Sequence, residues 1–169
     1  MPYYNDTVAD NVGNNEHVPT GCAATAMAIK MRFHEHPTYG HGSHAYYDEC
    51  DGEEHYHSVS FWSHLYDWSD MPKEEVTSTN QDVADLMYHC GVAIEMDYEE
   101  CLSTKWPDGD DWDAYFYYEG TEEIWDNHED TIKTSIKGGL PVVFSNEGHV
   151  VLADGYRDTE AMHFHLNHA

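Results

Sequence analysis

The spacing of apolar residues predicts helices through most of the chain. Residues 22–33 begin with small alanines and continue with methionine and isoleucine, a composition typical of a helix. In residues 80–90 the apolar positions recur every three or four residues, so they share one helical face. Asn80 is suited to cap this helix, and Gly91 is expected to end it. Two further helices are predicted over residues 110–118 and 126–137.

The spacing of apolar residues changes from a helical to a strand pattern after Gly138 and Gly139, which are expected to end the last helix. Short apolar segments separated by turns then predict three strands, "PVVFS", "HVVLADGY" and "AMHFHLN". Residues 34–60 are interpreted as an extended excursion with a short hairpin, and the aromatic residues 61–72 as core-packing.

Helices first and an antiparallel sheet last predict an α+β domain with two lobes. We expect one domain over residues 1–169, with a helical lobe over about 1–125 and a β lobe over about 126–169. Residues 1–21, rich in Asn, Asp, Gly and Pro, are interpreted as a loop.

Charge narrows the function classes. Seven basic residues face 33 acidic ones, for a formal net charge of -26. Nucleic acid and anionic membrane surfaces both need Lys and Arg, so neither is an expected partner. The acids are dispersed along the chain, which favours adaptation to high salt or strong selection for solubility.

The chain shows no apolar segment of the roughly 18 residues that a membrane span needs. Its first residues, "MPYYNDTVADN", lack the basic flank and apolar stretch of a signal peptide. The protein is therefore expected to stay inside the cell or to be a mature or trimmed fragment.

Four cysteines occur, and no two of them form a CxxC pair. A structural zinc site of the usual spacing is thus not expected. Cys90 and Cys101 are interpreted as core residues. Cys22 and Cys50 complete the set.

Cys22 is the candidate nucleophile because it follows Gly21 where a loop becomes a helix. A helix N-terminus stabilises a thiolate, and the backbone N–H of Cys22 is a candidate oxyanion donor. His149 near the start of a strand is the candidate base, and Asn167 on the next strand could orient it. The order Cys, His, Asn is that of a papain-type thiol protease.

Several segments, in order, resemble the streptopain-like cysteine peptidases, a branch of the papain-like fold. "PTGCAATAMA" resembles the nucleophile motif of that family, and "PYYND" its Pro-Tyr-Asn segment. "GHGSHAYY", "YDWSDMP" and "VADLMYHCGVAIEMDY" are similar to its next three segments. "GGLPVVFS", "GHVVLADGY" and "FHLN" resemble its final strands.

The resemblance implies a papain-like fold and peptide-bond hydrolysis through an acyl-enzyme. It makes Cys22 the nucleophile, His149 the general base and acid, and Asn167 the residue that orients His149. On the same matching, Gly148 and Ser43 are candidate substrate-binding residues. It implies protein or peptide substrates with an apolar pocket, a propeptide or inhibitor as partner, no cofactor or metal, and secretion, while a cytoplasmic location stays open.

Three departures from the family pattern bear on activity. A Gln that precedes the Pro-Tyr-Asn segment in the family, and supplies an oxyanion donor, has no counterpart before Pro2. Asn167 is followed by His168 and Ala169 instead of Trp-Gly-Trp. "EECLSTK", residues 99–105, replaces a Gly-Ser-Gly-Ala stretch. Signal peptide, prodomain and C-terminal end are therefore expected to be missing from this chain.

Two alternatives stay open. A papain-like binding module or truncated fragment could keep the fold without catalysis. A metal-binding role is the other, because 14 histidines include three His-x-His pairs, a spacing that puts both side chains on one face of a strand. These pairs are His34 with His36, His55 with His57, and His163 with His165.

Overall fold

Helices and two small antiparallel sheets make up the described part of the chain. The computed structural model describes residues 19–50, 53–73, 80–98, 105, 109–118, 129–146, 148–157 and 163–167. Its helices are α1 (Cys22–His34), the 3-10 helix η1 (Phe61–Ser63), α2 (Gln81–Ala93), α3 (Gly109–Phe116) and α4 (Glu129–Lys137). Its strands are β1 (His44–Cys50), β2 (Glu53–Val59), β3 (Val142–Asn146), β4 (His149–Arg157) and β5 (His163–Asn167). The α+β prediction is confirmed, and residues 1–18 lie outside the described residues.

The three predicted C-terminal strands form one antiparallel sheet in the order β3-β4-β5. Four consecutive β4 residues, Val150 to Ala153, are buried, as expected for a central strand covered on both faces. The register between β4 and β5 shifts between Ala153 and Gly155. Such a bulge adds one residue to β4 and bends the strand locally.

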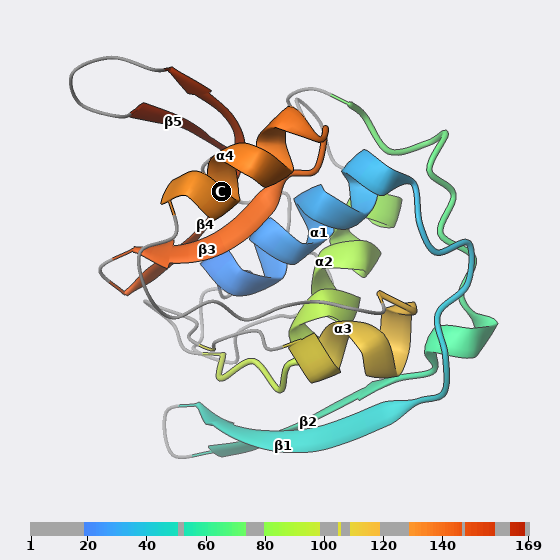
Figure 1. The fold of residues 1–169 in the computed structure, drawn as a ribbon. Helices are drawn as coiled ribbons and strands as arrows, with labels where there is room; N and C mark the ends of the chain where they lie inside the picture. The colour runs from blue at the N-terminus through green and yellow to red at the C-terminus, as the bar shows by residue number, and fades with distance from the viewer. Residues whose placement is uncertain are drawn as a thin grey trace.

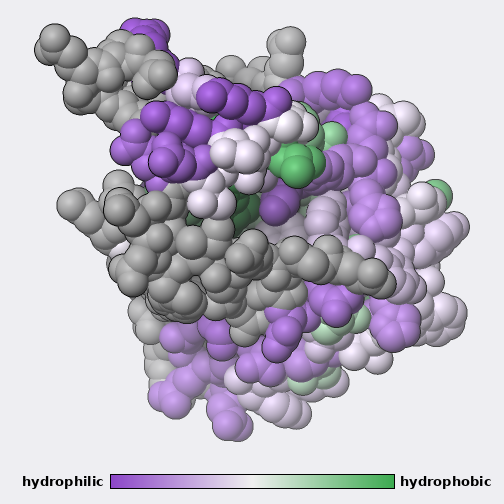
Figure 2. Space-filling model, viewed as in Figure 1, coloured by the Kyte–Doolittle hydropathy of each residue, from purple (hydrophilic) through white to green (hydrophobic). Residues whose placement is uncertain are grey.

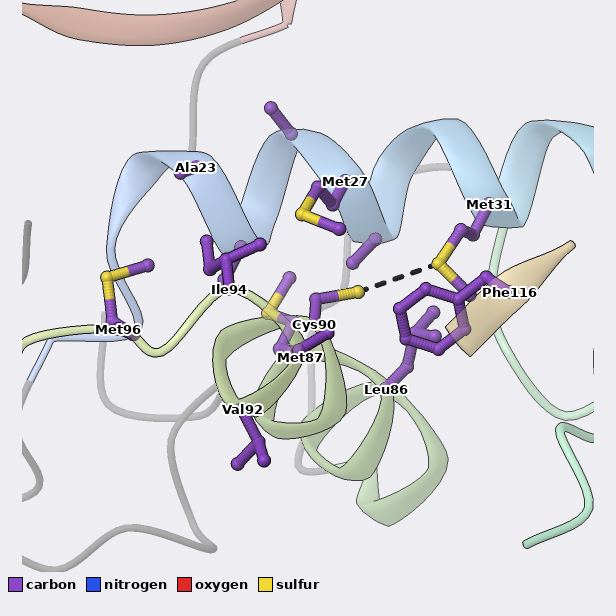
Figure 3. Close-up of a cluster of buried hydrophobic side chains, with 14 of the residues drawn as sticks. Ala23, Met27, Met31, Leu86, Met87, Cys90, Val92, Ile94, Met96 and Phe116 are labelled. Carbon is purple, nitrogen blue, oxygen red and sulfur yellow. Dashed lines mark hydrogen bonds between the residues drawn. The ribbon is translucent and has the colours of Figure 1, made fainter. Parts of the chain in front are cut away.

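Helix α1 lies between this sheet and α2, and it carries the centre of the core (Figure 1). Its alanines Ala23 and Ala24 are fully buried, because small side chains let neighbouring elements approach closely. Farther along, Met27 and Met31 of α1 pack against Leu86 and Cys90 of α2 (Figure 3). The Cys90 thiol donates to the Met31 sulfur at 3.6 Å, so Cys90 is a core residue as predicted.

The predicted capping of α2 is confirmed, whereas its predicted end is wrong. The Asn80 side chain accepts the Val83 N–H at 2.9 Å. The helix continues through Gly91 to Ala93, because Gly91 serves packing and not termination. A Cβ at Gly91 would overlap the Tyr98 hydroxyl, so only glycine lets Tyr98 pack there.

The hairpin β1–β2 confirms the expected excursion and covers one side of the molecule near α3 (Figure 1). Its inner face is held by polar contacts to the segment after α2. The Tyr46 hydroxyl donates to the Met96 carbonyl at 2.6 Å, and the buried Asp48 carboxylate accepts the Tyr98 N–H at 3.0 Å. The other Asp48 oxygen lies 3.0 Å from Nε2 of His57.

The aromatic segment after the hairpin packs as predicted, since Phe61, Tyr66, Trp68 and Met71 are buried. No helix among the described residues has the length and apolar character to cross a membrane.

Candidate active site

Cys22 is the first residue of α1, and Gly21 is its N-cap. The backbone of Gly21, with φ 86° and ψ 141°, occupies a region that is open chiefly to glycine. Glycine has no side chain to bond the first-turn N–H groups, as Asn80 does in α2. Those donors therefore stay directed at whatever lies beyond the helix end.

The first turn of α1 carries no acidic residue. The other described α-helices do carry acids there: Asp82 in α2, Asp110 and Asp111 in α3, and Glu129 and Asp130 in α4. A carboxylate beside Cys22 would repel a thiolate, whereas the positive end of the helix dipole attracts one. In so acidic a chain, the first turn of α1 is therefore set apart by carrying no acidic side chain beside Cys22.

The Cys22 sulfur also meets the C-terminal sheet. It accepts the backbone N–H of Val150 at 3.3 Å, across 128 residues of sequence. Two covalent bonds separate the Val150 nitrogen from the His149 Cα, so Sγ lies within about 6 Å of that Cα. The structure therefore brings Cys22 and His149 to the same place.

His149 opens β4 directly after Gly148, whose φ of 87° forms the turn from β3. Its backbone pairs with Asn146, and its side chain is exposed, while the next four residues are buried. His149 thus lies at the rim of the sheet, with core behind it and solvent in front. At this exposed position the His149 side chain is accessible to a molecule bound at the surface.

Asn167 ends β5, the strand next to that of His149. Its backbone pairs with Leu152, three residues along β4 from His149, which is about 10 Å of strand. Ser43 is exposed and directly precedes β1. The residues flanking Ser43 contact η1 and the turn after α2, through Gly42 with Trp62 and His44 with Glu95, so it is held by other elements than those of Cys22 and His149.

Two of the three His-x-His pairs lie on strands as predicted, namely His55 with His57 on β2 and His163 with His165 on β5. His34 ends α1 and His36 follows a turn, so this pair does not lie on a strand. His55 and His57 do lie on β2, but His57 is buried against Asp48. No group of three or more His, Cys, Asp or Glu side chains suited to a metal was found among the described residues. Cys101 and most of residues 99–105 lie outside them.

Sequence reasoning missed two contacts of Cys22 and its helix. One is the Val150 N–H, a backbone donor that leaves no signature in a sequence. The other is Thr25, whose hydroxyl donates to the Gly21 carbonyl at 2.9 Å. The sequence signal that could have indicated this bond is a threonine four residues after the N-cap residue.

Known proteins match this chain along nearly its whole length. The model of the Peptidase C10 family matches residues 1–168. The thiol protease/hemagglutinin PrtT of Porphyromonas gingivalis is 25% identical over 166 residues, covering 86% of this chain. The chain spans 18% of the length of that curated relative.

Solved structures agree with the family match. Active wild-type interpain A, a cysteine protease of Prevotella intermedia, superposes with a TM-score of 0.76 and 26% identity, covering 91% of this chain and 71% of that one. A mutant fragment of prointerpain A superposes with a TM-score of 0.74 at 26% identity, covering 91% of this chain and 54% of that one. The chain therefore belongs to the Peptidase C10 family, the streptopain-like cysteine peptidases, and has their papain-like α+β fold.

Proposed function

We propose that this chain is a cysteine endopeptidase with Cys22 as nucleophile and His149 as general base and acid. The role of Asn167 in orienting His149 is proposed on the family pattern alone, because the Asn167 backbone pairs with Leu152, about 10 Å along β4 from His149. The observation that carries the proposal is the 3.3 Å bond from the Val150 N–H to the Cys22 sulfur. It holds the start of β4, and with it His149, against the helix end that bears the thiol.

In the first half-reaction the Cys22 thiolate attacks the peptide carbonyl carbon and a C–S bond forms. The carbonyl oxygen becomes an oxyanion, which the N–H of Cys22 stabilises. When the intermediate collapses, the C–N bond breaks and the His149 imidazolium gives its proton to the leaving amine. The product is a thioester between the acyl group and Cys22.

In the second half-reaction neutral His149 takes a proton from water, and the hydroxide attacks the thioester carbonyl. The C–S bond breaks, the carboxylic acid leaves, and the proton taken from water stays on His149, so the thiolate–imidazolium pair is restored. Protein or peptide substrates, recognised near Gly148 and in an apolar pocket, and a propeptide follow from the family. Ser43 is a further candidate for substrate contact, and secretion is proposed on the family alone.

The test is the rate of Cys22 alkylation by iodoacetamide as a function of pH, followed by peptide mass spectrometry in molar NaCl. Ordinary thiols have a pKa of about 8.5 and react slowly below pH 7. We expect Cys22 to react readily at pH 6 and the His149→Ala variant to lose that reactivity. Cys50, Cys90 and Cys101 are internal controls, and Cys90 in particular should stay unreacted because it is buried.

Casein digestion then measures turnover. We expect His149→Ala to lower kcat/KM by about 10²- to 10⁴-fold, the usual contribution of general acid–base catalysis. If Cys22 of the wild-type chain reacts only as fast at each pH as an ordinary thiol, the Cys–His pair is not assembled. The chain is then a binding module that keeps the peptidase fold.

A further inference from the structure

We infer that Thr25 is a positioning residue for catalysis: it fixes the peptide unit whose N–H group serves as the oxyanion donor. The inference rests on the proposed function, because the donor is the backbone N–H of Cys22. It concerns a buried side chain, 6% exposed, on the first turn of α1.

Thr25 makes two hydrogen bonds to one atom. Its backbone N–H donates to the Gly21 carbonyl oxygen at 3.2 Å, and its hydroxyl donates to the same oxygen at 2.9 Å. The first bond is the ordinary one that opens an α-helix. The hydroxyl adds a second, shorter bond from a buried side chain with few alternative rotamers.

The Gly21 carbonyl and the Cys22 N–H belong to one peptide unit. That unit is planar and trans, so its C=O and N–H point in opposite directions. Holding the oxygen toward Thr25 therefore holds the N–H outward, beyond the N-terminal end of α1. The orientation of the donor and the orientation of the carbonyl are a single degree of freedom.

This peptide unit needs such a restraint because Gly21 supplies none. Glycine crosses between backbone regions with little steric resistance, and Gly21 already occupies one at φ 86° that other residues avoid. A rotation of the unit about its two flanking bonds would turn the donor away from the oxyanion. The Thr25 hydroxyl opposes that rotation.

A threonine bonded to the carbonyl four residues earlier is common in helices. Within this chain, the Thr134 hydroxyl donates to the Asp130 carbonyl of α4 at 2.7 Å in the same way. That peptide unit carries no reacting group. Thr134→Val is therefore a matched control that removes the same kind of bond elsewhere.

The experiment compares Thr25→Val, which keeps the branched shape and removes the hydroxyl, with Thr25→Ser, which keeps the hydroxyl. Three readouts are taken: kcat and KM on a peptide substrate, the inhibition constant of a short apolar peptide aldehyde, and Cys22 alkylation by iodoacetamide at pH 6. Cys22 adds to the aldehyde carbonyl to give an oxyanion, whereas alkylation forms no oxyanion. Of these quantities, only kcat and the inhibition constant depend on the donor.

We expect Thr25→Val to lower kcat by about 3- to 30-fold, part of the loss that follows removal of an oxyanion donor. The aldehyde should bind more weakly by a similar factor, while KM and the alkylation rate stay within about twofold of wild type. Thr25→Ser should restore both kcat and aldehyde binding, and Thr134→Val should change neither.

Wild-type values for Thr25→Val in kcat and aldehyde affinity would overturn the inference. So would a parallel loss of alkylation, because Thr25 would then act on the helix as a whole. A failure of the proposed function is distinguishable, since it would be seen in the wild-type chain before any variant: no alkylation at pH 6 and no aldehyde binding.

Discussion

His89 is a titratable ring inside the core. It is 8% exposed on α2, and the Tyr66 hydroxyl lies 2.9 Å from its Nδ1. The His64 ring packs edge-on against it at 4.5 Å between centroids. Burial, and secondly the His64 charge, lower the pKa of His89 to about 3. The folded state therefore holds His89 neutral down to about pH 3.

This pKa predicts acid sensitivity. The unfolded value is 6.5, so between pH 6.5 and about 3 the unfolded chain binds a proton that the folded chain refuses. Stability from His89 is full above pH 6.5 and falls by about 1.4 kcal/mol for each pH unit below it. Urea unfolding of wild type and His89→Gln at pH 7, 5.5 and 4.5 should show the variant gaining on wild type as pH falls. A constant gap between the two would contradict the assignment.

Some residues of the candidate site could be predicted from the sequence, and others could not. Cys22 and His149 could be predicted because each has a local sequence pattern: a cysteine that follows a glycine, and a histidine that begins a strand. The hydrogen bond that brings their elements together could not be predicted, because its donor is the main-chain N–H of Val150 and its acceptor, the Cys22 sulfur, lies 128 residues away. Thr25 was missed because its value depends on which carbonyl it reaches.

At the scale of elements, the packing of α2 depends on Gly91 having no side chain. Gly91 lies inside the helix, where alanine would normally gain about 1 kcal/mol. The Tyr98 hydroxyl occupies the space of that Cβ, and this buried hydroxyl has no hydrogen-bond partner among the described residues. Packing has overridden helix propensity here.

Gly91→Ala should therefore destabilise the chain by about 1–2 kcal/mol, because overpacking exceeds the gain in propensity. Tyr98→Phe alone should be neutral or stabilising, since it removes an unsatisfied buried hydroxyl. The double variant should recover most of the loss, although the ring carbon Cζ still lies 3.1 Å from the new Cβ. Thermal unfolding of the four chains measures the coupling, and strictly additive effects would rule out this contact.

Element boundaries show the limit of local patterns. The start of α2 was predictable because capping by Asn80 is local, and the end of α4 because Gly139, with φ 78°, closes the helix. The end of α2 was not, because the reason for Gly91 is a tyrosine on a later segment. A short hairpin was predicted within residues 34–60, but its docking was not, because that docking uses Asp48 and Tyr46 against the main chain after α2.

At the scale of the whole molecule, charge is the dominant property. The described surface in Figure 2 is mostly polar, with apolar side chains visible in only a few places. The chain has 33 acidic residues and only seven Lys and Arg residues, so most of the acidic side chains cannot pair with a Lys or an Arg. Three of these basic side chains form ion pairs: Arg32 and Lys73 each pair with Glu35, and Lys133 pairs with Glu129.

Molar NaCl should therefore raise the melting temperature by several degrees relative to dilute buffer, because it screens repulsion that the folded state concentrates. For a chain of this size each kcal/mol corresponds to about 2–4 °C. Sucrose of equal osmolality is the control, since it strengthens burial without screening charge. A flat response between low and molar NaCl would show that the acidic surface costs the fold nothing.

The bond between Cys22 and Val150 also has a consequence in time. A ribosome makes the thiol first and its partner 128 residues later, so at about 5–20 residues per second the interval is on the order of ten seconds. Throughout that interval Cys22 has neither the Val150 amide nor His149 beside it. Synthesis itself thus delays the chemistry of the nucleophile until the sheet that completes it has been made.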